Sequence, residues 1–453
     1  MKRICRTTIL PAVLTVLLAV GQSTAIAQPV HASRPMTLRD AVTLALQQNL
    51  QVRFAAFEVA IARAQLEQAK AGKAVQVTGS ASYTRINERA PTTVTVGPVP
   101  PLLPSAVTVQ IPPPAVDNWD LRVSLQYPLF TGGRLEAQIA LAEASVRGAE
   151  ATLQRTVQQV LFQVKQAYYQ LLLAEATRKA AERILAQAEE NVRVARVRVQ
   201  AGVAPQFDAL QAEVHLANAR QGVVRAHNGV ILARQTLAAL LNLPLDTPLE
   251  PQEELAIIPV TSTLEELVSR ALRERPELAE LSARRAAAEA GLELAKSGAR
   301  PNLALQGAYS VGGTSPTSLS ANWSVTLAVT LNLFDGGLTR ARIREAEERL
   351  RQLQVAESQQ RQAIELEVRQ SYLMVQSALA ELEASGKAVE QAREALRIAN
   401  VRYQAGVSPQ LEVISSQAAL AQAEANRVQA LFNYNLALAQ LERAVGGPVT
   451  RSP

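Results

Sequence analysis

Along most of this chain, apolar side chains recur every three or four residues, the spacing that gives an α-helix one apolar face. From residue 134 to residue 201 there is no proline and a single glycine, and residues 338–405 share this composition. A helix of 68 residues would be about 100 Å long. No ordinary globular core has that length, so these helices must pack along others, and residues 206–243 and 410–445 are the expected partners.

Elsewhere apolar and polar side chains alternate strictly, which predicts β-strands with one apolar face. The clearest strands are residues 117–130 and 321–334, and weaker alternation precedes them at residues 75–86 and 301–313. These lengths suit strands that cross a membrane at a tilt. Aromatic residues stand near the strand ends, where a membrane-interface girdle would place them: Tyr83, Trp119, Tyr127, Tyr309 and Trp323. A half-buried sheet in a soluble domain would alternate in the same way.

The chain is internally duplicated. The phrases VRVQAGVAPQ and VRYQAGVSPQ begin 204 residues apart, and the two tryptophans, Trp119 and Trp323, keep the same offset. Tyr83 and Tyr309 are 226 residues apart, so the first copy carries 22 extra residues. A register that holds across tryptophans, glycines and prolines indicates a repeated structural unit.

This duplication predicts the organisation of the chain as two copies of a helix, two strands, a long helix and a further helix. We expect a first repeat at residues 28–244, a linker at 245–262, a second repeat at 263–448 and a C-terminal tail at 449–453. Eight prolines lie between Tyr83 and Trp119. Because proline resists strand pairing, we expect residues 91–114 to form an extended loop on the outer surface.

The duplicated phrase lies where each long helix is expected to end. A glycine stops the helix and a proline three residues later begins the next one. The two turns at these helical tips are Gly202, Val203, Ala204 and Pro205 in the first repeat, and Gly406, Val407, Ser408 and Pro409 in the second. A plain turn would explain either one alone, but their likeness indicates that both tips meet the same kind of partner.

The N-terminus has the pattern of a secretory signal peptide. Lys2, Arg3 and Arg6 precede an apolar stretch that is too short to span a membrane, and Ala25-Ile26-Ala27 suits cleavage. Removal of residues 1–27 takes away Cys5, the single cysteine, and lowers the net charge from +6 to +3. The exported chain would therefore have no disulfide or lipidated cysteine, and its mild charge gives no sign of nucleic-acid binding.

Export, the lack of a spanning helix, and strand hairpins joined to very long helices favour a membrane sheet over a soluble one. A sheet in a membrane must close, because lipid satisfies no open strand edge. Membrane barrels have at least about 8 strands, whereas this chain offers four. The barrel must therefore be shared between copies of the chain.

Two other classes of protein fit the sequence less well. An enzyme is disfavoured because the histidines do not have metal-ligand spacing, no glycine-rich loop is placed to hold phosphate, and carboxylates alternate with arginines as on solvated helix faces. We expect no catalytic residue, cofactor or metal. A periplasmic coiled-coil adaptor, or an envelope-spanning structural protein, would explain the signal peptide and the helices. It would give the aromatic-bounded strand hairpins no role.

The signal peptide, the two repeats and the Leu-Phe-x-Gly-Gly turns at residues 129–133 and 333–337 together resemble the TolC-like outer-membrane efflux family. The resemblance covers residues 37–448. It implies a mainly α-helical homotrimer, in which a shared 12-stranded β-barrel in outer-membrane lipid tops a periplasmic α-barrel tunnel. It also implies an exit duct for efflux or type I secretion, partnered by an inner-membrane transporter and a periplasmic membrane-fusion adaptor.

The same resemblance implies roles for residues near the tips. The two tip turns match the family's adaptor-docking turns, and Glu412 matches an acidic position that rings a narrow periplasmic gate. Ser415 stands where some members have a second acidic residue. Asp208 and Tyr403 match positions that help to hold the coiled coils closed, and Ser408 stands where a basic residue can complete that link.

Overall fold

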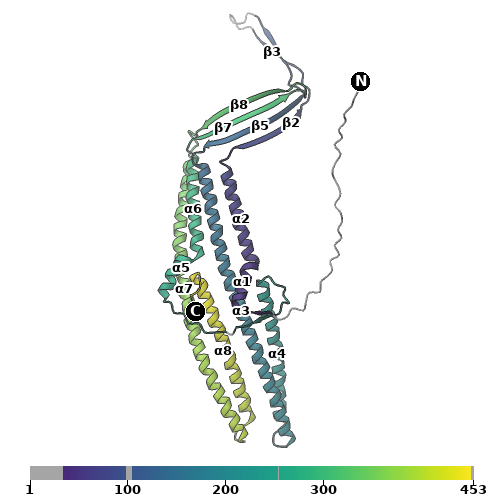
Figure 1. Ribbon diagram of the computed structural model, residues 1–453, viewed down its shortest axis with the longest axis vertical. Coiled ribbons are helices and arrows are strands. Elements are labelled where there is room, and N and C mark those ends of the chain that lie inside the picture. The colour runs from purple at the N-terminus through teal and green to yellow at the C-terminus, as the bar shows by residue number, and fades with distance from the viewer. Residues whose placement is uncertain (1–33, 98–104, 254, 450–453) are drawn as a thin grey trace, which may run out of the picture.

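The computed structural model describes residues 34–97, 105–253 and 255–449. The predicted signal peptide lies outside the described residues, as does most of the predicted tail. Figure 1 shows an elongated molecule with a β-sheet at one end and two helical hairpin tips at the other. Each long helix runs from the sheet to a tip, so the described residues are spread along the molecule rather than gathered around one globular core.

Two helices of 67 residues form the frame, close to the length expected from the sequence: α3 (Arg134–Gln200) and α7 (Leu338–Gln404). Shorter helices flank them in the half near the sheet, namely α2 (Leu50–Ala71) and α6 (Pro276–Ser297). Others flank them in the half near the tips, namely α4 (Gln206–Leu240) and α8 (Gln410–Val445). The helices lie in the order α2, α3, α6, α7 near the sheet and α4, α3, α8, α7 near the tips.

Small residues allow these helices to approach closely. Along α3, Ala137, Ala144 and Ala151 are buried at seven-residue intervals, the spacing of a coiled-coil seam. Two shorter helices lie across the middle of the bundle, α1 (Leu38–Gln48) and α5 (Leu264–Glu274). Each begins with a capping box, formed by Thr37 with Asp40 and by Thr263 with Glu266. These boxes satisfy amides that a helix N-terminus leaves unpaired.

Two equivalent cores occupy the middle of the molecule, where α1 packs on α3 and α4, and α5 packs on α7 and α8. Buried Tyr168 donates a hydrogen bond to the carbonyl oxygen of Met36 at 3.0 Å. Tyr434 donates to the carbonyl oxygen of Ile258 at 2.5 Å. Burial raises the pKa of Tyr168 to about 12. These hydroxyls tie the segments that precede α1 and α5 to the long bundle.

The predicted linker, residues 245–262, contributes to the first core. Its strand β6 (Leu249–Pro251) pairs in parallel with β1 (Arg34–Met36), and Leu249 is fully buried in the first core. An apolar side chain that reaches the core stabilises the segment through burial.

Four strands form one antiparallel sheet in the order β2, β5, β7, β8. They are β2 (Gln76–Arg85), β5 (Asp117–Phe130), β7 (Asn302–Gly313) and β8 (Ser320–Thr330). The last strand ends four residues before the predicted residue 334. The predicted alternation also fails at Leu129, because the register shifts between Pro128 and Phe130. Proline has no N–H for the ladder, so a bulge is favoured there.

The expected loop at residues 91–114 contains a hairpin. β3 (Thr92–Val96) pairs antiparallel with β4 (Val107–Ile111), and the pair projects past the main sheet (Figure 1). The prediction of an unpaired loop was wrong here because the prolines cluster outside two short stretches of valine and threonine. Those stretches keep their N–H groups and have high β-propensity.

Candidate functional site

The strand register sorts the side chains of the main sheet onto two faces, since directly opposed residues share a face. One row runs across all four strands from Val77 to Leu125, Gly307 and Val325. The same face carries Trp119, Leu121, Val123, Tyr127, Leu305, Tyr309, Val311, Trp323, Leu327 and Val329. The sheet therefore has one continuous apolar face.

The opposite face is polar and hollowed. Its depression has a volume of about 330 Å³ and is lined mainly by Gln76, Thr78, Arg122, Ser124, Gln126, Gln306, Ser324 and Thr326. A sheet that is apolar on one side and polar on the other suits a wall between lipid and water. In the described part of the chain, none of the helices is both long and apolar enough to cross a bilayer.

The five predicted interface aromatics all lie on the apolar face. Tyr83 is opposite Trp119, with ring centroids 4.5 Å apart, and Tyr309 is opposite Trp323. Tyr127 lies toward the helical end of the sheet, near the start of α3. Their role at a membrane interface stays a prediction.

The two tips have the same backbone geometry. Gly202 and Gly406 adopt φ of +70° and +75°, and the amides of Val203 and Val407 donate back to the carbonyls of Arg198 and Arg402 at 3.0 Å. This is a Schellman motif, in which a left-handed glycine lets the chain reverse. Pro205 and Pro409 are the N-caps of the next helices rather than their first residues.

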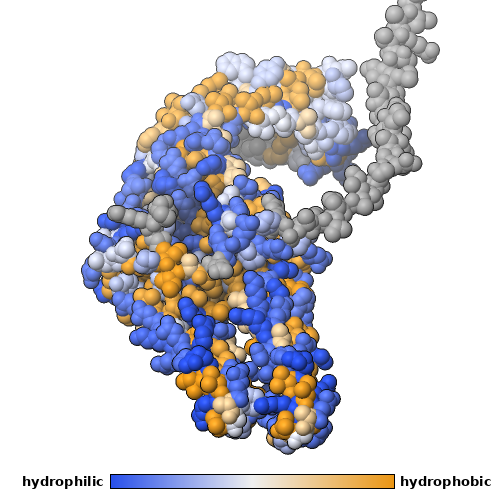
Figure 2. Space-filling model, turned by 60° about the horizontal axis from the view of Figure 1, so that its bottom comes forward, coloured by the Kyte–Doolittle hydropathy of each residue, from blue (hydrophilic) through white to orange (hydrophobic). Residues whose placement is uncertain are grey.

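The tips expose apolar side chains to solvent. Val203 is 72% exposed and Val407 is 68% exposed. Phe207, Leu210 and Leu411 continue each apolar patch onto the following helix, and Figure 2 shows hydrophobic side chains gathered at both tips. An exposed apolar patch of this kind favours contact with another protein.

Three of the predicted gate residues, Glu412, Ser415 and Tyr403, make contacts that the sequence did not indicate. Glu412 accepts a hydrogen bond from Arg402 at 2.9 Å within its own hairpin, and Ser415 donates to the carbonyl oxygen of Glu412 at 3.0 Å. The guanidinium of Arg198 lies 4.3 Å from the centre of the Tyr403 ring, a cation–π contact. This contact joins α3 of the first hairpin to α7 of the second.

The predicted roles of Asp208 and Tyr403 in holding the coiled coils closed stay predictions. Among the described residues, the Asp208 side chain makes no hydrogen bond or ion pair, and the buried hydroxyl of Ser408 has no hydrogen-bond partner. Arg198 and Arg402 are the residues that the sequence reasoning missed. The arginines stand at equivalent positions in the two repeats, 204 residues apart, and this repetition was the signal that could have pointed to them.

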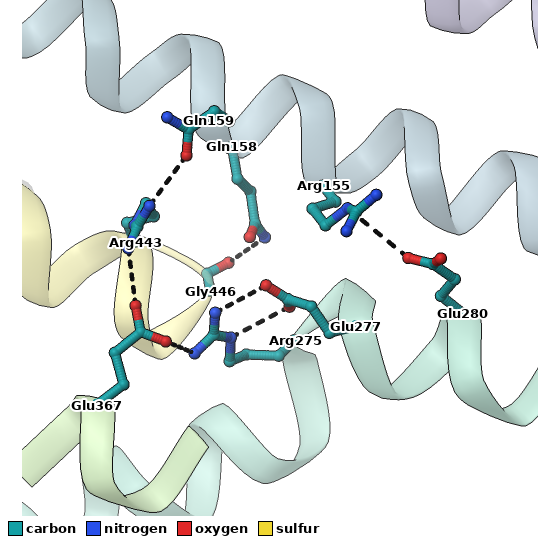
Figure 3. Close-up of polar contacts among 9 residues, drawn as sticks. All are labelled: Arg155, Gln158, Gln159, Arg275, Glu277, Glu280, Glu367, Arg443 and Gly446. Atoms are coloured by element: carbon teal, nitrogen blue, oxygen red, sulfur yellow. Dashed lines mark hydrogen bonds and ion pairs between the residues drawn. The ribbon is translucent and has the colours of Figure 1, made fainter. Parts of the chain in front are cut away.

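A polar node joins the two repeats at mid-length (Figure 3). Arg275, with only 6% of its side chain exposed, pairs with Glu277 at 2.7 Å and also with Glu367. Arg443 binds Glu367 at 2.8 Å and donates to Gln159 of α3 at 3.0 Å. Burial opposes the charged form of Glu277, but the hydrogen bond and charge of Arg275 outweigh it and lower the pKa of Glu277.

No metal centre is built from the described residues, which hold no group of three or more histidine, cysteine, aspartate or glutamate side chains with suitable placement. The chemistry available therefore lies in an amphipathic sheet, two apolar tips and charged contacts between hairpins. These features suit a wall, a path and a docking surface.

Comparison with known proteins identifies the chain. A model of the family described as outer membrane efflux protein matches residues 41–243 and 267–447. The chain belongs to that family. The two matched segments fall one in each repeat, and the family consists of channel proteins rather than enzymes. This efflux protein therefore resides in the cell outer membrane, with long helices that extend into the periplasm.

Curated relatives and solved structures agree with this. The efflux protein is 26% identical to outer membrane protein OprJ of Pseudomonas aeruginosa, over 90% of this chain and 84% of that one. It is 28% identical to the pyoverdine export outer membrane protein OpmQ of the same organism, over 73% and 69%. The solved OprN outer-membrane channel matches with a TM-score of 0.74 at 23% identity, over 91% of this chain and 90% of that one. At this identity the likeness shows the fold.

Proposed function

We propose that three copies of this outer-membrane efflux protein close into one ring, the exit duct of a tripartite efflux or type I secretion system. Three sheets of four strands supply the twelve strands of a shared barrel. One sheet alone is below the roughly 8 strands that a membrane barrel needs. One observation carries this proposal. The first repeat contacts the second within a chain, but the equivalent contacts from the second repeat back to a first repeat are not made in a single chain.

Within one chain, β5 of the first repeat pairs with β7 of the second, and α3 packs on α6 and α8. Applying the duplication once more, β8 should pair with a β2, and α7 should pack on an α2 and an α4. In one chain these elements form the two outer edges. A neighbouring copy provides the missing partners, and repetition around an axis closes the ring.

The chemistry of the open edges fits such a contact. Phe54, Phe57 and Ile61 on α2 are exposed, as are Leu366 and Leu373 on α7. Apolar side chains repeated along both edges favour burial between protomers.

The two glycine turns before the long helices also differ between the repeats: one is packed and the other is open. A Cβ on Gly132 would lie 2.7 Å from Cβ of Arg300, whereas its counterpart Gly336 faces open space. The first turn is packed by the second repeat of its own chain. A neighbouring copy would pack the second turn in the same way.

The faces of the sheet assign the path. The apolar face lies against lipid, and the polar face lines a wet lumen that continues between the helices. The apolar tips, far from the sheet (Figure 1), dock a periplasmic membrane-fusion adaptor, which couples the duct to an inner-membrane transporter. Three Glu412 carboxylates around the tip opening form the periplasmic gate, together with Asp208, Ser415 and Tyr403.

Disulfide trapping tests whether β8 of one copy pairs with β2 of the next in one defined register. The pairing of Ser124 with Ala308 between β5 and β7 predicts that Ala328 of one copy lies opposite Ser82 of the next. Directly paired residues lie about 4.5–5.5 Å apart between Cα atoms, which suits a disulfide. Ala328→Cys with Ser82→Cys should give covalent trimers on non-reducing gels of outer-membrane fractions.

The matched control is Ala328→Cys with Ala81→Cys, which places the second thiol on the opposite face. Trapping of both pairs alike, or of neither, would contradict the closure. The alternative is that this chain is a periplasmic adaptor, but that function would not explain the apolar face of the sheet. An adaptor would appear in soluble or inner-membrane fractions instead.

A further inference from the structure

A surface at the start of α7 combines exposed apolar and basic side chains. Just beyond the end of β8, Leu333 is 90% exposed and Phe334 is 91% exposed. Arg340 and Arg344 follow on the first two turns of α7 and are also exposed. We call these four residues the α7 collar. It lies where the sheet meets the helices (Figure 1).

The electrostatics of the collar are unfavourable within the chain. Arg340 and Arg344 are four residues apart, so two like charges share one helix face. The first turn of α7 contains no acidic residue, and cations near a helix N-terminus oppose its dipole. Neither arginine forms an ion pair in the described part of the chain, and two of the next acids along α7 are already paired, namely Glu345 with Arg349 and Glu348 with Arg351.

The backbone amides at the start of α7 are not free to bind an external anion, because Asp335 already occupies two of them. Asp335 accepts hydrogen bonds from the amides of Gly337 at 3.0 Å and Thr339 at 2.8 Å. Its hydrogen bonds with Thr339 lower the pKa of this carboxyl. Any anion met by Arg340 and Arg344 is therefore bound through their side chains.

The first repeat shows that the collar stays accessible when a neighbouring element is in place. Its α3 is flanked on both sides by α2 and α6. Glu136 and Ala140, the counterparts of Arg340 and Arg344, nevertheless remain exposed, and so do Leu129 and Phe130, the counterparts of the two apolar residues. Glu136 pairs with Lys73 at 2.8 Å. The second repeat has replaced that local pair with two unpaired cations.

We propose that the α7 collar binds the anionic headgroups of membrane phospholipids at the periplasmic edge of the barrel. This proposal rests on the proposed function, in which the apolar face of the sheet lies in lipid. The collar continues that face: Leu333 and Phe334 lie at the acyl boundary. Arg344 lies six residues past the helix start, about 9 Å along the axis, which is comparable to the screening length of about 8 Å at physiological salt.

Native mass spectrometry of the detergent-purified, full-length mature protein tests the collar. Phosphatidylglycerol and phosphatidylcholine are added separately, and the lipids retained per oligomer are counted. Wild type should retain phosphatidylglycerol preferentially. Arg340→Gln with Arg344→Gln should weaken its binding about 25-fold, because each basic residue at an anionic surface contributes roughly a factor of five. Lysine at both positions should keep the preference.

The matched control is Arg361→Gln with Arg369→Gln, which removes the same charge from the middle of α7. Equal lipid retention by the collar variant and wild type would overturn the proposal. So would an equal loss in the control, or binding of inorganic phosphate alone with the same arginine dependence. Loss of trimers in the collar variant, with no lipid preference in wild type, would assign the arginines to an acidic partner on the next protomer. Absence of wild-type trimers would instead count against the proposed function.

Discussion

At the scale of single residues, the tips are governed by a few charges whose partners are now clear. Glu412 is paired with Arg402 of its own hairpin, so the carboxylate proposed to ring the gate is partly neutralised. Arg198 is held against Tyr403, so the arginines at equivalent positions in the two repeats do different work. One binds a carboxylate within a hairpin, and the other connects two hairpins.

Charge removal on either side of the Arg402–Glu412 pair should therefore move ion selectivity in opposite directions. Glu412→Gln should reduce cation preference and block by divalent cations from the periplasmic side. Arg402→Gln frees the carboxylate and should increase both. A change of about fivefold corresponds to about 1 kcal/mol, the interaction of unit charges 4 Å apart in water. Single-channel recording in planar bilayers measures it, and identical selectivity in the two variants would remove Glu412 from the gate.

At the scale of elements, each hairpin tip is a rigid turn that presents an apolar surface. The Schellman geometry is satisfied by the backbone alone, so the side chains of Val203 and Val407 have no role in holding the turn. Their exposure leaves them free to contact a partner. The helical hairpins and the docking surface can therefore be changed separately.

Aspartate at both Val203 and Val407 should abolish export through the cognate pump while trimers remain intact. The charge would be desolvated in an apolar contact, which is costly, but it stays in water in the free trimer. Export is measured by retention of the pump substrate in cells, and trimers by gel mobility. Val109→Asp, an exposed valine on the β3–β4 hairpin at the far end, is the control. Normal export by the double variant would argue against docking at the tips.

At the scale of the whole molecule, the polar node of Figure 3 fixes the two repeats relative to each other at mid-length. Arg275 brings the α5–α6 junction to Glu367 of α7, and Arg443 carries the link through Glu367 to Gln159 of α3. Beyond this node the two hairpins extend to the tips, where the contact of Arg198 with Tyr403 joins them again. A change here should reach both hairpins.

Arg275→Gln should destabilise the protein by about 3–5 kcal/mol at pH 7, the cost of removing one partner from a buried ion pair. The folded-state pKa of Glu277 is depressed below its usual 4.5. Its contribution is therefore present above about pH 4.5 and is lost as pH falls through the folded-state pKa. The difference in unfolding free energy between wild type and variant should then narrow as the pH falls below about 4.5. Thermal unfolding followed by circular dichroism measures this, with exposed Arg220→Gln, far from the node, as the control. A stability difference that does not change with pH would contradict the coupling between Glu277 protonation and folding.

The sequence by itself determined the long helices, the four strands of the main sheet and their repetition. Helix period, strand alternation and glycine–proline punctuation are local properties, so the lengths of α3 and α7, the four strands and the two tip turns all followed from them. The duplication added the equivalence of residues 204 positions apart. The site residues at the tips were placed at turns for the same reason.

Only the tertiary structure decided which side chains meet. The pairing of Arg402 with Glu412, the stacking of Arg198 on Tyr403 and the node around Arg275 depend on helix rotation and stagger, which periodicity leaves undetermined. The β3–β4 hairpin forms through the few residues that lie between the prolines. The number of prolines in the whole segment says nothing about those residues. Leu249 entered the core because packing selects one apolar side chain by its position in space. Local patterns fix periodicity, whereas contacts between distant residues require three-dimensional placement.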